Sequence, residues 1–65
     1  MGELLPIPLS EQIECVEREL KLRQSVYARR IAAGKMTVSL AERETGRMRA
    51  VLDTLIRIDM GLRLP

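Results

Sequence analysis

The segment Gly34-Lys35-Met36-Thr37 separates two long stretches whose apolar residues recur with the period of an α-helix. Glycine readily adopts the left-handed conformation in which many helices end. Thr37 can begin the next helix by accepting a backbone N–H bond on its side chain, and Ser39, the first residue of a Ser-x-x-Glu capping box, is the alternative start. The sequence therefore predicts an antiparallel helical hairpin over residues 10–61, with its turn at 34–37.

The first predicted helix begins at Ser10, which is a favourable N-cap, and runs to about Ala33. At 100° per residue its apolar side chains form two stripes. One stripe consists of Ile13, Val16, Leu20, Tyr27 and Ile31. The other, well around the helix, consists of Cys15, Leu22, Val26 and Ala33. Because one neighbouring helix covers only one stripe, we expect this helix to have at least two neighbours.

The second predicted helix carries an apolar seam with alternating spacings of four and three residues, which is typical of near-antiparallel helix pairs. The seam consists of Ala41, Thr45, Met48, Leu52 and Leu55. Leu40, Val51 and Ile58 widen it on one side. Gly61 is expected to end the helix, and residues 62–65 to form a short tail.

A chain of 65 residues has to offset a loss of conformational entropy of roughly 100 kcal/mol, which the single seam of two helices cannot do. With one cysteine and no histidine, neither an internal disulfide nor a zinc site is expected. Self-association is the remaining way for so short a chain to gain enough stability to fold. We predict an all-α hairpin that dimerises into a four-helix bundle, or assembles further. The predicted oligomer or partner interface consists of Ile13, Val16, Leu20, Leu22, Val26, Tyr27, Ile31, Met48, Leu52 and Leu55.

Residues 1–9 form an apolar arm in which Pro6 and Pro8 oppose helix formation. A strap packed over the end of the bundle is the favoured interpretation. A docking peptide and simple disorder are the alternatives.

The sequence shows no arrangement of residues that indicates catalysis, a metal site or a cofactor, so we expect no enzyme. Cys15 is predicted to be a small buried apolar residue, because no base lies near it in the sequence. No apolar run approaches the ~20 residues that span a membrane, and no signal peptide is visible. We expect a cytoplasmic protein without membrane contact.

The net charge of +2 is unevenly distributed. Residues 1–23 carry a net charge of −2 and residues 24–50, around the turn, carry +4. The basic residues can complement the helix dipole, can pair with the acidic end of a second hairpin, or can bind nucleic acid. The candidate nucleic-acid contacts are Arg29, Arg30, Lys35, Arg43 and Arg47.

Several short strings along residues 10–58 resemble a group of small uncharacterised proteins of prophages and tailed bacteriophages. They are Glu14-Cys15-Val16-Glu17-Arg18-Glu19, Val26-Tyr27-Ala28-Arg29, Gly34-Lys35-Met36-Thr37 and Met48-Arg49-Ala50-Val51-Leu52. Members of that group commonly have proline after the tyrosine, where this chain has Ala28. The resemblance implies a phage or prophage origin and a bacterial cytoplasm, and it brings no activity.

From these observations we predict a phage-encoded, oligomeric interaction module that binds and modulates a host or phage protein by surface complementarity. The alternative is an accessory nucleic-acid-binding protein that uses the basic turn end. A self-assembling piece of a virion is a third possibility.

Overall fold

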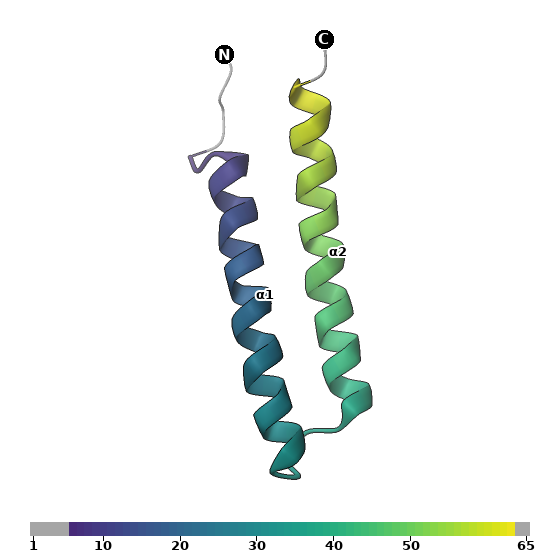
Figure 1. Cartoon of the computed structure of the whole chain (residues 1–65). Coiled ribbons are helices and arrows are strands. Elements are labelled where there is room, and N and C mark those ends of the chain that lie inside the picture. Colours follow the sequence, from purple (N-terminus) through teal and green to yellow (C-terminus); the bar gives the residue numbers. More distant parts are fainter. Residues whose placement is uncertain (1–5, 64–65) are drawn as a thin grey trace.

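The computed structural model describes residues 6–63, and these form two antiparallel helices joined by a short turn (Figure 1). Helix α1 spans Leu9–Ala32 and helix α2 spans Val38–Arg63. The two helices lie side by side along their length, and the described residues contain no strand. The predicted all-α hairpin is therefore confirmed.

The turn is a Schellman motif centred on Gly34, whose φ of +74° lies in the left-handed region. The Gly34 N–H donates to the Ile31 carbonyl oxygen at 3.0 Å, and the Lys35 N–H donates to the Arg30 carbonyl oxygen at 2.8 Å. These two bonds satisfy carbonyl groups that the end of α1 would otherwise leave unpaired. Gly34 thus ends α1 as the sequence predicts.

Thr37 caps the second helix. Its Oγ1 accepts the Leu40 N–H at 3.0 Å, and its carbonyl oxygen accepts the Ala41 N–H at 3.1 Å. This geometry is that of an N-cap with helix residues beginning at Val38. Of the two predicted starts, Thr37 is confirmed and Ser39 is wrong.

The outer ends of both helices differ from the prediction. Helix α1 begins at Leu9 with Pro8 in the N-cap position, so Ser10 lies inside the first turn and does not cap it. The fixed φ of proline suits a helix entry, and the Pro8 carbonyl oxygen accepts the N–H groups of Glu11 and Gln12 at 3.1 Å. Helix α2 continues through Gly61 to Arg63, so the predicted stop at Gly61 and a tail beginning at Leu62 are wrong. Gly61 keeps a negative φ, because the chain around it remains helical.

The core of the hairpin is thin. Among the described residues only Ala41 is buried, at 8% exposure. The other apolar residues of the interhelical seam are half-buried: Ile13, Val16, Leu20, Tyr27 and Ile31 on α1, and Met48, Leu52, Leu55 and Ile56 on α2. Two helices thus form one layer with one shared seam, and no side chain is enclosed on all sides.

The described part of the N-terminal arm does not cover the helices. Ile7 is 52% exposed, and its carbonyl oxygen accepts a hydrogen bond from Gln12 Nε2 at 2.8 Å. Pro6 and Pro8 are also exposed. Leu4 and Leu5, which would form most of a strap, lie outside the described residues.

Two glycine substitutions should have opposite effects on stability. Gly34→Ala places a Cβ in the left-handed region, which should lower the free energy of unfolding by about 1–2 kcal/mol. Gly46→Ala lies in the interior of α2, where alanine should raise it by about 0.5–1 kcal/mol. A Cβ at either site meets no atom within 4 Å, so sterics with neighbours contribute to neither effect. Urea unfolding followed by circular dichroism measures both changes, and stabilisation by Gly34→Ala would contradict the left-handed turn.

Candidate interaction surface

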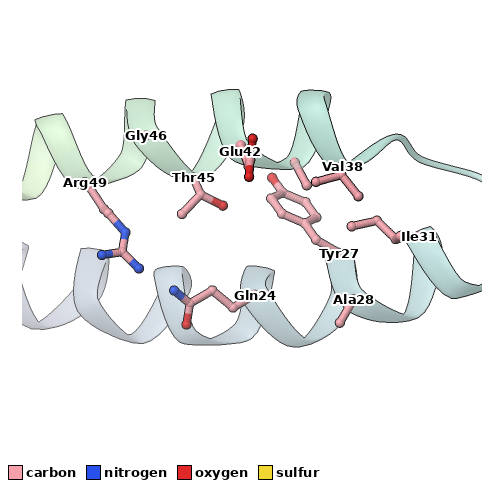
Figure 2. Close-up of a pocket in the computed structure, with 10 residues that line it drawn as sticks. Gln24, Tyr27, Ala28, Ile31, Val38, Glu42, Thr45, Gly46 and Arg49 are labelled. Carbon is pink, nitrogen blue, oxygen red and sulfur yellow. The ribbon is translucent and has the colours of Figure 1, made fainter.

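One face of the hairpin carries an open groove between the helices with a volume of about 410 Å³. Gln24 and Ala28 of α1 line it, together with Glu42 and Arg49 of α2. Figure 2 shows Tyr27 projecting from α1 toward α2 at the end of the groove near the turn, with Arg49 farther along. Much of the groove lining is apolar: besides the ring of Tyr27 it includes Ala28, Ile31, Val38 and Ala41.

The groove also carries polar groups. Its polar groups are an amide at Gln24, a carboxylate at Glu42, a hydroxyl at Thr45 and a guanidinium at Arg49. Residues 6–63 contain no group of three His, Cys, Asp or Glu side chains placed to hold a metal ion. The groove therefore presents hydrogen-bonding and charged groups around one aromatic ring, an arrangement suited to a peptide or protein surface.

A cluster of charges lies between the two helices. The pKa of Arg23 is raised, first by the neighbouring Tyr27 hydroxyl and then by the carboxylates of Glu19 and Glu44. Glu19 is one turn away on α1, with 3.8 Å between its Oε1 and the Arg23 Nε. Glu44 belongs to α2, where it pairs with Arg47.

The face opposite the groove carries these charged residues and a set of exposed apolar side chains. At 100° per residue, Val26 lies about 20° from Glu19 around α1 and about 160° from Ala28, which lines the groove. By the same measure Val51 lies about 20° from Glu44 around α2 and about 160° from Arg49. We call this surface the apolar face; it consists of Cys15, Leu22 and Val26 from α1 and Leu40, Val51 and Ile58 from α2.

The apolar face is exposed in the hairpin. Its five large side chains are between 37% and 55% exposed, and Cys15 is exposed as well. The expectation that Cys15 is buried is therefore wrong for the single hairpin. A hollow lined by Ala50, Val51, Thr54 and Leu55 adds to this face along α2.

The residues predicted for the interface thus fall into two groups. Eight of them are half-buried along the seam inside one hairpin: Ile13, Val16, Leu20, Tyr27, Ile31, Met48, Leu52 and Leu55. The other two, Leu22 and Val26, lie on the apolar face. The predicted interface did not include Leu40, Val51 and Ile58, which the spacing on α2 predicts as a flank of the seam.

The predicted basic residues surround the turn, and all are exposed. Two of them have partners in the hairpin: Arg47 Nη1 lies 3.0 Å from Glu44 Oε2, and Arg29 Nη1 donates to Ser25 Oγ at 3.3 Å. Within the described residues, Arg30, Lys35 and Arg43 have no ion-pair partner. The turn end therefore presents three free cations.

Neither of the two described helices is long and apolar enough to cross a membrane. Comparisons with protein-family models, with curated proteins and with solved structures found no match. The resemblance to phage and prophage proteins, and the location expected from it, therefore stay predictions.

Proposed function

We propose that the protein is a small oligomeric interaction module, which completes its core by binding another chain through the apolar face and binds a target protein through the surface left outside. The observation that carries this proposal is the apolar face itself. Six apolar side chains lie on the same side of both helices, in a hairpin with one buried residue among those described.

The arrangement of the helices supports an incomplete fold. The two helices lie side by side in a single layer, and among the described residues only Ala41 is buried. Stable domains pack at least two layers of secondary structure around a core, and this hairpin supplies one layer. A second layer on the apolar face would produce the four-helix arrangement predicted from the sequence.

The surface area leads to the same conclusion. The chain exposes 5169 Å², whereas a compact monomer of 7.4 kDa exposes about 4,200 Å². The difference is of the same order as the ~800 Å² that each partner buries in a protein–protein interface of standard size. Covering the apolar face would therefore bring the chain close to the area of an ordinary folded protein.

If two or more chains associate through their apolar faces, the groove of each hairpin remains exposed to solvent. Each hairpin would then offer Tyr27, with its flanking polar groups, to a target protein. Tyrosine is enriched where binding energy concentrates in interfaces, because it buries a large ring and keeps a hydroxyl for hydrogen bonding. By covering part of a target's surface in this way, the protein would modulate the target without a catalytic step.

A charged substitution on the apolar face should break the oligomer. We expect Leu22→Glu to raise the dissociation constant at least about 100-fold, because each pair of chains would bury two unpaired carboxylates. Leucine and glutamate have similar helix propensities, so α1 itself should persist locally. Sedimentation equilibrium measures the dissociation constant.

Val38→Glu is the matched control. Val38 is 55% exposed, like Leu22, but it lines the groove on the other face. We expect this variant to associate like the unaltered protein. Equal dissociation constants for the two variants would contradict a role for the apolar face in association.

The three free cations at the turn support a second candidate function, binding of nucleic acid. If Arg30, Lys35 and Arg43 contact three phosphates of duplex DNA, raising the salt from 50 to 200 mM should weaken binding about 40-fold. Replacing all three with glutamine should abolish that binding.

The control for this test is Arg57→Gln with Arg63→Gln, because both arginines pair with aspartates of α2 away from the turn. Fluorescence anisotropy with a labelled 20-base-pair duplex measures the affinities. Binding that is absent or independent of salt in the unaltered protein would eliminate this candidate.

A further inference from the structure

The spacing of apolar residues on the exposed side of α1 is symmetric. Cys15, Leu22, Val26 and Ala33 follow one another at intervals of seven, four and seven residues, so the stripe reads the same in both directions about residue 24. All four residues are exposed in the hairpin. A stripe of this kind can pack against an antiparallel copy of itself, with every apolar residue meeting another.

The stripe on α2 is symmetric only in part. Leu40 and Ile58 are each nine residues from position 49, on opposite sides of it, whereas Val51 has Arg47 at the matching position. A twofold axis perpendicular to the helices at the level of residue 24 would therefore relate the α1 stripe to itself.

We propose that a second copy of this chain covers the apolar face in an antiparallel arrangement, with the two turns at opposite ends of a four-helix bundle. This rests on the proposed function, in which that face binds another chain. An interface with twofold symmetry requires a self-complementary surface. Here Leu22 meets Val26 of the second copy, and Cys15 meets Ala33.

A parallel arrangement, with both turns at one end, would also join the apolar faces. The charges near the turns favour the antiparallel arrangement over the parallel one. The parallel arrangement places the free cations Arg30, Lys35 and Arg43 of both copies next to one another, where like charges repel. The antiparallel arrangement places them beside the first turns of α1 of the second copy.

The end of the hairpin away from the turn is less basic than the turn end. Within the described residues, Glu11 and Glu14 have no ion-pair partner in the hairpin, and neither have the basic residues Arg18 and Lys21. The same antiparallel register brings Glu19, on the side of α1 that bears the apolar face, to the level of Arg30 of the second copy. The antiparallel arrangement thus avoids placing the two basic turn ends side by side.

Distances between spin labels on the two chains distinguish the arrangements. Ser10→Cys, in a Cys15→Ala background, places one label on each chain at an exposed position near the start of α1. At 1.5 Å per residue, two such labels lie about 42 Å apart along an antiparallel bundle centred on residue 24. In a parallel bundle they lie within about 25 Å, since only the width of the bundle separates them.

Pulsed electron paramagnetic resonance measures this distance. A distance near 40 Å, lost on dilution with excess unlabelled protein, is the expected result, and Lys35→Cys should independently give about 33 Å. A distance within 25 Å would overturn the antiparallel arrangement and leave the proposed function standing. The absence of any dipolar coupling would show that the chains do not pair, and would overturn both.

Discussion

The structure depends on the single seam that two helices share. Each helix can turn only one stripe of side chains toward the other, so nine half-buried apolar residues and one buried alanine hold the hairpin together. The turn fixes which stripes meet, because the left-handed Gly34 and the Thr37 cap set where one helix ends and the next begins. Within residues 6–63, nine large apolar side chains remain exposed outside that seam.

Five of those nine side chains belong to the apolar face, whereas Val38 lines the groove on the other side. Association through the apolar face would add the second layer that the hairpin lacks, and would leave two grooves and two basic turn ends outside. In this account the scarcity of core and the availability of binding surface are two consequences of the same fold.

The sequence predicted the elements whose signals are local. Gly34 and Thr37 act through their own backbone and side chain, and both were predicted correctly. The predicted helix start at Ser10 and helix end at Gly61 were wrong because neighbouring residues determine both boundaries. Pro8 begins α1 earlier, and the helix on both sides of Gly61 keeps that residue helical. The apolar stripes were visible in the sequence, but their common face was not, because it depends on how the turn rotates α2 about α1. For that reason the predicted interface did not include Val51 and Ile58, which the structure leaves exposed.

The central claim is that the apolar face is covered by another chain, and the mass of the unaltered protein in solution tests it most directly. Light scattering behind a sizing column, at low and at high salt, measures that mass. The account predicts a species of twice the 7.4 kDa of one chain at both salt concentrations, because apolar contacts are not screened by salt. A helical species of 7.4 kDa under both conditions would contradict it.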